Sequence, residues 1–294
     1  TGLTVGARQR ARMLATGNDK TRKEAARSNL RLHPLGSGSD YTPFLQHLGL
    51  ASSNSGFGGE GGGGSYHTLY DTYEHFTRFH DPEFAYGVTL AQVNGRALLR
   101  LANAEVLPFE FRAFSGDMAR AVEGLETLAD KMRTETERVN GLIEDGRFAA
   151  ALDPTQPLQP PSRKAEVPHF NFAPLQNALG QLDESAEAFE TARTAASPPA
   201  DALQQLNKLL YTSERLLTRE HGLPGRPWYR HHIYAPGFYT GYGAKTFPGV
   251  REAIEQRRFD EVEEQIVIVA GILESFAARL DEAAALLPSP EAGD

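Results

Sequence analysis

Residues 258–287 carry apolar side chains at steps of three and four, which predicts a long amphipathic helix. The side chains of this stripe are Val262, Ile266, Val269, Leu273, Phe276, Leu280 and Leu287. Such a helix is stable in a protein because its apolar face packs against other elements. The chain therefore needs a helical bundle around this segment. Because the stripe must be buried somewhere, we also expect a homodimer.

Three more helical patterns occur in the second half of the chain. Residues 114–144, 173–195 and 199–218 combine apolar and charged positions in a helical rhythm. Residues 153–168 hold five prolines, which exclude a helix and predict an exposed connection. Residues 222–249 form a loop rich in Pro, Gly and aromatic residues, and a loop of this length inside a bundle is usually functional.

The first half of the chain has a different pattern. Residues 3–30 are basic with few strongly apolar positions, which predicts one or two surface helices. From Tyr41 the pattern predicts a short helix, a turn at Gly49 and a buried apolar strand that ends near Asn54. Residues 81–108 predict a long, mostly buried helix that ends at a proline.

These patterns divide the chain in two. Residues 1–110 are predicted to be the C-terminal part of an α/β domain, and residues 111–294 a mainly α-helical bundle interrupted by one long loop. With 294 residues, the chain is long enough to bury a sizeable core. The glycine-rich stretch at 56–64 is the only low-complexity tract, and such a run taken alone is typical of a flexible surface loop.

Composition excludes several classes of function. The formal net charge is −8 and no basic patch gathers, so we expect no nucleic-acid partner. The chain has no cysteine, which excludes disulfides, thiolate metal sites and cysteine nucleophiles. No apolar run approaches the roughly 20 residues of a membrane span, and residues 1–12 lack the apolar core of a signal peptide. The sequence begins at Thr1 and not at an initiator methionine, so we expect a further segment to precede it.

Several separated stretches of the chain resemble one family of proteins. They read LGSGSDYTPFLQHLGLAS, YHTLYDTYE, DPEFAYGVTLAQVNGRALLRLANAEVLPFE, WYRHHIYAP and YGAKTFPGVREAI. The first three resemble the second half of the zinc peptidase domain in the family of glutamate carboxypeptidase II and the transferrin receptor. The last two resemble a loop and the following helix of that family's helical dimerisation domain. The resemblance covers residues 34–288, and several motifs in the family's order are more specific than any one alone.

The resemblance implies a site with two zinc ions. His67 matches the last zinc ligand of that site, and neutral imidazole is a normal zinc donor. Tyr66 matches a tyrosine whose hydroxyl stabilises the oxyanion of the tetrahedral intermediate. The preceding glycines would let a loop fold over the metal cleft and deliver the Tyr-His pair. Without the resemblance, a single histidine is more often a surface or packed residue, and tyrosines also pack for their bulk.

The resemblance also implies substrate contacts. The loop GSGSD, which contains Gly38, Ser39 and Asp40, matches a stretch that lies along the substrate, where glycine lets the backbone approach a ligand closely. Tyr242 matches a tyrosine that reaches the terminal carboxylate of the substrate. Asn54 stands where the glutamate-specific enzyme has an arginine patch, and is a further candidate for substrate contact.

Three departures from the family pattern concern substrate choice. Ser39 replaces a substrate-contacting asparagine, Asn54 begins the stretch that replaces the arginine patch, and Gly241 replaces the lysine that precedes the carboxylate-binding tyrosine. Selectivity for acidic substrates rests on Arg and Lys side chains that clamp carboxylates. We therefore expect a broader peptide or dipeptide substrate than glutamate-containing ones.

Other chemistry-bearing residues are expected to be structural. Asp71 lies four residues after His67 and could share a helical face with it, but the resemblance gives it no metal role. His231 and His232 are adjacent, and adjacent side chains point apart in any regular element. The string HDPEF at 80–84 is predicted to start a helix. A nucleophile elbow and a phosphate-binding loop both fail to match their motifs here.

The chain does not carry a complete catalytic site. Hydrolysis by two zinc ions needs a bridging carboxylate, further ligands and a general base, and the resemblance places these upstream of Thr1. The chain has no H-x-x-E-H or H-E-x-x-H helix that could replace them. We therefore expect the chain alone to be inactive.

Two hypotheses for the intact protein remain. In the first it is a zinc exopeptidase, to which this chain contributes Tyr66, His67, substrate-lining loops and the dimer interface. In the second it is a non-catalytic dimerisation module, like the transferrin receptor. A binding protein has no need for a ligand histidine beside an oxyanion tyrosine, which favours the first. The resemblance suggests a secreted, periplasmic or membrane-anchored ectodomain.

Overall fold

The computed structural model describes residues 2–27, 30–58, 64–153, 155, 159–195 and 198–288. The chain forms two compact units, residues 1–35 and 36–294. The helices are α1 (Val5–Thr16), α2 (Asp19–Ala25), α3 (Tyr73–His75), α4 (Ala85–Ala102), α5 (Phe111–Glu144), α6 (Arg147–Ala151), α7 (Ala173–Ala195), α8 (Leu203–Thr212), α9 (Pro248–Glu255) and α10 (Phe259–Ala284). The strands are β1 (Tyr234–Pro236) and β2 (Ala244–Thr246), and short π- or 3-10-helical turns span Pro43–His47, Phe76–His80 and Ser213–Leu217.

The first unit is a pair of helices, α1 and α2. The Thr4 hydroxyl oxygen accepts a hydrogen bond from the Ala7 N–H (3.1 Å), and Asn18 Oδ1 accepts one from the Thr21 N–H (2.9 Å). These side chains satisfy backbone donors that would otherwise lack partners at the helix starts. No residue of α1 is buried. The two surface helices predicted for residues 3–30 are thus confirmed.

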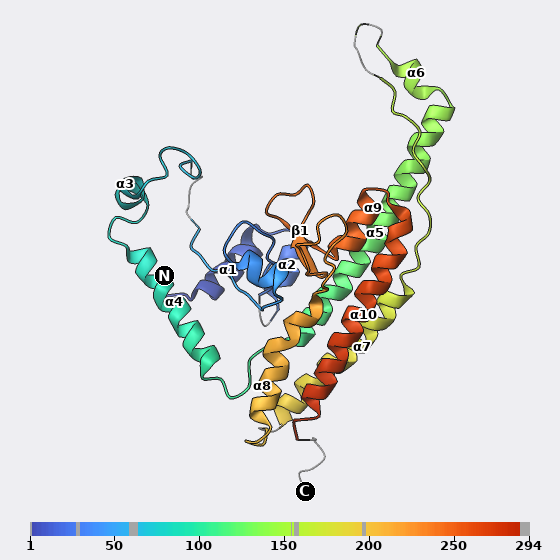
Figure 1. Cartoon of the computed structure of the whole chain (residues 1–294). Coiled ribbons are helices and arrows are strands. Elements are labelled where there is room, and N and C mark those ends of the chain that lie inside the picture. The colour runs from blue at the N-terminus through green and yellow to red at the C-terminus, as the bar shows by residue number, and fades with distance from the viewer. Residues whose placement is uncertain are drawn as a thin grey trace. The chain divides into compact units, whose positions relative to one another are not determined.

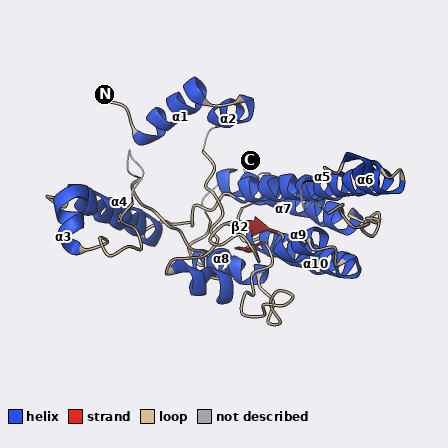
Figure 2. Ribbon diagram, turned by 90° about the horizontal axis from the view of Figure 1, so that it is seen from above, coloured by secondary structure: helices blue, strands red, loops and turns tan. Residues whose placement is uncertain are grey.

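The second unit is built on a helical bundle. Helices α5, α7 and α10 lie side by side along much of their length, and the short α9 packs beside α10 and α5 (Figures 1 and 2). Two acidic residues in the first turn of α10, Asp260 and Glu261, complement the positive end of the helix dipole. The predicted bundle is therefore present, and α7 has the bounds that its pattern predicts.

The apolar stripe of α10 is buried inside its own chain. Val262, Val269 and Leu273 have no exposed surface, and Phe276 is 3% exposed. The Phe276 ring meets Phe111 edge-to-face at 5.7 Å between centroids. Covering this stripe therefore needs no second copy of the chain, so the stripe does not support the homodimer that we expected from it. A dimer must use other surfaces.

The proline-rich connection follows α5 without forming a helix. Residues 159–168 have no regular secondary structure, and side chains of α5 bind their backbone. Asn140 donates from Nδ2 to the Lys164 carbonyl (2.9 Å) and accepts from the Lys164 N–H (3.1 Å). Arg133 donates to the carbonyls of Val167 and Pro168. Side chains thus replace the backbone partners that proline segments lack, and the predicted connection is confirmed over its described residues.

The long aromatic loop contains a small antiparallel hairpin. Strands β1 and β2 pair with Ala235 opposite Lys245, and the described residues contain no further strand. The predicted apolar strand ending near Asn54 does not form, and residues 50–58 are irregular. A strand needs a neighbour to satisfy its backbone, and none of the described segments offers one. The expected α/β sheet is therefore absent from the described part of this chain.

The segment around α4 is far more exposed than predicted. The helix forms, and Asp81 starts it by accepting hydrogen bonds from the N–H groups of Tyr86 (3.2 Å) and Gly87 (2.9 Å). No residue of α4 is buried, however, and Leu98 is 67% exposed. The prediction of a mostly buried helix is thus wrong for this chain, because no described element covers the apolar face. None of the described helices combines the length and apolar character needed to cross a membrane.

The buried His232 gives the fold a pH dependence. Its ring is 2% exposed, and neither ring nitrogen has a hydrogen-bond partner among the described residues. Burial lowers the pKa of His232 from its ordinary value of 6.5 to about 4, and nearby His231 and Arg219 add to the shift. The unfolded chain therefore binds a proton between these values that the folded chain does not, so stability falls as the pH drops through this range.

Urea unfolding of the chain checks this expectation. Between about pH 7.5 and about pH 4.5, His232 is expected to remove about 2.5 kcal/mol from the free energy of unfolding. The variant His232→Leu should flatten the pH profile by that amount, since it leaves every other titrating group in place. An unchanged pH slope in this variant would show that His232 contributes nothing.

Candidate functional site

Tyr66 and His67 form an exposed stacked pair. Their ring centroids lie 3.8 Å apart with an interplanar angle of 19°, and Tyr66 is 66% exposed. No hydrogen bond to a described residue engages the His67 ring, which leaves its nitrogens available to an outside partner. Among the described residues, His67 is exposed and does not pack in a core. Residues 59–63, with most of the glycine run, lie outside the described residues, and so does the expected fold of that loop over a metal cleft.

The backbone at His67 is unusual for a non-glycine residue. Its φ of 59° lies in the left-handed region, which side chains with a Cβ enter at a cost. The turn is held by Asp71, whose Oδ2 accepts the His67 N–H (3.2 Å), and by Thr68, whose hydroxyl donates to the Ser65 carbonyl (2.7 Å). Asp71 thus supports the turn that presents the imidazole. Backbone conformations of this kind persist only where surrounding contacts stabilise them, and they are frequent at functional sites.

The described residues do not hold a complete metal site. No group of three or more His, Cys, Asp or Glu side chains among them could bind a metal ion. Zinc in proteins takes four donors in structural sites and three protein donors with an open position in catalytic sites. His67 therefore fits as one donor, and the described part of this chain does not supply the others.

The predicted substrate loop meets Tyr242. The Ser37 N–H donates to the Tyr242 carbonyl (3.1 Å). A Cβ at Gly36 would fall on that carbonyl, and a Cβ at Gly38 would fall on the Tyr242 ring. Gly38 also has a φ of 96°, which only glycine adopts freely. The structure thus brings together Gly38 and Tyr242, two candidates that lie far apart in the sequence.

Gln46 links this loop to the second half of the chain. Its Nε2 donates to the Gly36 carbonyl (3.1 Å), and its own backbone carbonyl accepts the N–H groups of Arg230 (2.8 Å) and His231 (3.2 Å). Next to it, His47 Nδ1 lies 2.8 Å from the Trp228 carbonyl oxygen, and the two rings stack. The turn at Pro43–His47 therefore fastens the substrate loop to the segment that leads into the hairpin.

The other candidates lie on exposed backbone. Ser39 and Asp40 are exposed in the turn that follows Gly38, and the Ser39 carbonyl accepts the Thr42 N–H (3.0 Å). Asn54 is exposed in the irregular segment before the glycine run. No hydrogen bond, ion pair or ring contact among the described residues joins the Tyr66–His67 pair to Gly38 or Tyr242.

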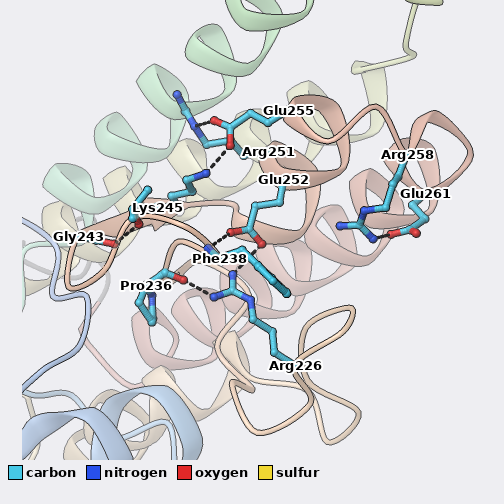
Figure 3. A network of polar contacts seen from close by, with 11 residues as sticks. Arg226, Pro236, Phe238, Gly243, Lys245, Arg251, Glu252, Glu255, Arg258 and Glu261 are labelled. Atoms are coloured by element: carbon cyan, nitrogen blue, oxygen red, sulfur yellow. Dashed lines mark hydrogen bonds and ion pairs between the residues drawn. The ribbon is translucent and has the colours of Figure 1, made fainter. Parts of the chain in front are cut away.

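A buried ion pair holds the hairpin that carries Tyr242. Arg226 Nη2 lies 2.7 Å from Glu252 Oε2, and these side chains are 12% and 4% exposed. Glu252 Oε1 accepts the Phe238 N–H (2.7 Å), while Arg226 also donates to the Pro236 carbonyl. Figure 3 shows that both side chains converge on the backbone of the hairpin. Charge-assisted hydrogen bonds of this kind fix geometry strongly in a buried setting.

A second ion-pair cluster lies at the base of the hairpin. Glu255 binds both Lys245 and Arg251, with Oε1 3.1 Å from Arg251 Nε (Figure 3). Lys245 belongs to β2 and the other two residues to α9, so the cluster joins the hairpin to the helix. Sequence patterns do not reveal either ion pair, because local periodicity carries no information on which charges meet.

His231 is structural, as predicted. Its Nδ1 accepts the N–H groups of Ile233 (3.2 Å) and Tyr234 (3.0 Å), so the ring proton sits on Nε2, 2.9 Å from Glu214 Oε1. The ring has no exposed surface. A histidine occupied at both nitrogens is not a free metal ligand, which separates His231 from the exposed His67.

A family model and several curated proteins match this chain. Residues 170–281 match the transferrin receptor-like dimerisation domain. "Probable glutamate carboxypeptidase LAMP1" of Arabidopsis thaliana is 31% identical over 223 residues, which cover 76% of this chain and 27% of that protein. "Probable glutamate carboxypeptidase" of Arthroderma benhamiae is also 31% identical, over 82% of this chain and 30% of its own length.

A third relative carries a different activity in its name. "Aminopeptidase NAALADL1" of Rattus norvegicus is 25% identical over 84% of this chain and 31% of its own length. The chain thus spans less than a third of the length of these curated relatives. The matches agree with the resemblance seen in the separated motifs. The chain belongs to the family of transferrin receptor-like and glutamate carboxypeptidase proteins.

Proposed function

We propose that this chain supplies one wall of a peptidase active site and the homodimer interface of a two-zinc exopeptidase. The main support for this proposal is the Tyr66–His67 pair, in which a left-handed turn presents the exposed imidazole. His67 would donate a ring nitrogen to one metal ion, and Tyr66 would donate its hydroxyl to the oxyanion that forms as the peptide bond is attacked. A donor next to the metal needs a fixed direction, which the turn provides.

The remaining active-site groups belong to other parts of the intact protein. Zinc, when bound, would supply Lewis-acid chemistry and activate water, and a single imidazole does not hold such an ion alone. The bridging carboxylate, the further ligands and the general base are assigned to residues outside this chain. The chain by itself is therefore expected to be inactive.

The exposed apolar surface of residues 66–101 supports the proposal that other parts of the intact protein complete the active site. Leu69 is 96% exposed, Tyr70 is 73% exposed, and α4 has no buried residue. Exposed apolar patches of this kind mark surfaces that another part of a protein covers. In the intact protein the rest of a peptidase domain would cover this face and set His67 beside the other ligands.

The substrate is proposed to be a peptide or dipeptide. Gly38, Ser39 and Asp40 would line its path, Asn54 would lie at its border, and Tyr242 would bind its terminal carboxylate. The contact between Gly38 and Tyr242 supports this grouping, since it sets the loop backbone directly against the carboxylate-binding ring. The relatives named carboxypeptidase and aminopeptidase are both peptide hydrolases by name.

The helical domain is proposed to form the homodimer. The match of residues 170–281 to a dimerisation domain supports this proposal, whereas the buried α10 stripe does not. In the second candidate function, a non-catalytic dimerisation module, the protein would form the dimer but would not hydrolyse peptides. The exposed and unengaged His67 ring favours the peptidase.

Activity and sedimentation measurements on the purified full-length protein distinguish the two functions. We expect it to release amino acids from dipeptides in the presence of zinc, to lose this activity on chelation and to regain it when zinc is restored. Sedimentation should show a dimer with or without activity. A dimer that hydrolyses no dipeptide at any zinc concentration would support the non-catalytic module and overturn the peptidase proposal.

A further inference from the structure

A short antiparallel contact precedes strand β1. Thr218 and His231 form an isolated antiparallel bridge. Beside this bridge the Arg219 N–H donates a hydrogen bond to the Arg230 carbonyl (2.9 Å). Two arginines therefore lie directly opposite each other on neighbouring backbone segments.

The side chains of Arg219, Arg230 and His232 gather on one face of this contact. Successive side chains of extended backbone point to opposite faces, so the neighbours of the bridged pair project away from the face of Thr218 and His231. Opposed Cβ atoms in such a pair lie roughly 5 Å apart, and diagonal neighbours roughly 7–8 Å. Burial is the main cause of the lowered pKa of His232, and the charges of His231 and Arg219 add to it, which places Arg219 near that ring.

No acidic side chain among the described residues neutralises this Arg–His cluster, which we define as Arg219, Arg230 and His232. Neither arginine forms an ion pair there. The Arg230 Nε and both ring nitrogens of His232 are buried without a hydrogen-bond partner. Glu214 is engaged elsewhere, since it binds His231 Nε2 (2.9 Å). Buried donors without partners are costly, and like charges placed opposite each other repel, so the cluster lacks an anion.

The cluster extends from solvent into the interior. Arg219 is exposed, whereas His232 is only 2% exposed. The Arg219 guanidinium approaches α10, where a Cβ at Gly271 would lie 4.0 Å from its Nη2. Glu220 and Glu274 are exposed, and neither forms an ion pair with Arg219 in the described part of the chain. A ligand would therefore meet Arg219 at the surface and the imidazole on its buried side.

We propose that the Arg–His cluster binds a tetrahedral oxyanion, phosphate or sulfate, either as a free ion or as the phosphate group of a larger ligand. Two guanidinium groups balance the charge of a dianion, and each presents a fork of N–H donors to its oxygens. A neutral imidazole adds one N–H donor. A tetrahedral oxyanion has enough oxygens for all three groups, whereas a carboxylate has two. This inference does not depend on the proposed peptidase function.

Calorimetric titration of inorganic phosphate into the full-length protein tests the site, in a buffer without other oxyanions and at constant ionic strength. We expect saturable binding with a Kd of about 1 mM or below. Arg219→Gln and Arg230→Gln should each weaken binding about tenfold or more, because each removes charge-assisted hydrogen bonds. Absence of phosphate binding, or unchanged binding in both variants, would overturn the inference.

Two control variants separate this cluster from other positions that attract phosphate. Arg215→Gln removes an exposed arginine from the adjacent turn Ser213–Leu217, and His67→Ala removes the proposed zinc ligand. Both variants should bind phosphate within about twofold of the parent, as is usual for a surface substitution. Equal weakening in Arg215→Gln and Arg219→Gln would indicate a nonspecific effect of charge. Loss of binding in His67→Ala would place the ion at the metal site. Either result would contradict the inference.

Two further ligands identify the chemistry that the cluster recognises. Acetate should bind about tenfold or more weakly than phosphate, because its two oxygens leave at least one donor of the cluster without a partner. Equal binding of acetate and phosphate would contradict the choice of a tetrahedral oxyanion. O-Phosphoserine that binds more tightly than phosphate would identify a phosphorylated ligand, and weaker binding would identify a free ion. Both results agree with the proposed site.

Thermal unfolding of the full-length protein gives a readout that a purely structural role would not produce. Without an oxyanion, Arg219→Gln should raise the Tm, because it relieves the repulsion between Arg219 and Arg230. In phosphate the order should reverse, because a ligand that binds the folded state raises the Tm of the parent more than that of the variant. A variant Tm that is lower by the same amount in both buffers would mean that a carboxylate of the intact protein already neutralises the cluster, and the inference would fail.

Discussion

Replacing His67 by alanine in the full-length protein is expected to lower kcat/KM for dipeptide hydrolysis by more than about a hundredfold. Loss of a residue that merely supports a metal ligand costs about 10- to 100-fold in affinity or activity, and loss of the ligand itself must cost at least as much. Zinc content should fall in parallel. The dimer should remain, because the proposed interface lies in the dimerisation domain of residues 170–281, whereas the ring contact of His67 among the described residues is with Tyr66.

A second histidine on the same segment provides the matched control. His80 is also exposed, and its ring contacts His75 and Phe76, so His80→Ala removes an imidazole without touching the proposed site. Activity and zinc content should stay within about twofold of the parent, as is usual for a surface substitution. Full activity in His67→Ala, or equal losses in both variants, would refute the assignment of His67.

The second large effect concerns the buried ion pair under the hairpin. Arg226→Met keeps the apolar stem of the side chain but leaves the Glu252 carboxylate buried without its partner. Removing one member of a buried pair typically costs about 3–5 kcal/mol, and we expect a loss of that size in urea unfolding. Arg251→Met removes a half-exposed partner of Glu255 and should cost about 0.5 kcal/mol or less.

A compensating substitution distinguishes the ion pair from simple packing. Glu252→Gln, added to Arg226→Met, removes the orphaned charge and keeps an oxygen that can accept the Phe238 N–H. The double variant should regain at least half of the lost stability, because an unpaired buried charge is the main cost. No recovery would show that Arg226 acts through packing alone.

Local patterns predicted the helical half of the chain well. The expected helix at 173–195 matches α7, and the one at 258–287 appears as Phe259–Ala284. Such helices are encoded by apolar spacing within the segment itself. The prolines at 153–168 likewise exclude a helix for a local reason.

The predictions that failed concern properties that depend on neighbouring structural elements. The strand near Asn54 and the burial of α4 both require a neighbouring element, and no described residue supplies one. The contact of Gly38 with Tyr242 and the pairing of Arg226 with Glu252 join residues that are distant in sequence, so no periodicity reveals them. The left-handed turn at His67 is also invisible to apolar patterns.

The most direct test is the position of zinc in crystals of the full-length protein, located by anomalous scattering at the zinc edge. We expect a zinc peak about 2.0–2.1 Å from a ring nitrogen of His67, with the Tyr66 hydroxyl facing the same cleft. A zinc centre with all its ligands elsewhere, and a His67 ring bonded to protein or open solvent, would contradict it.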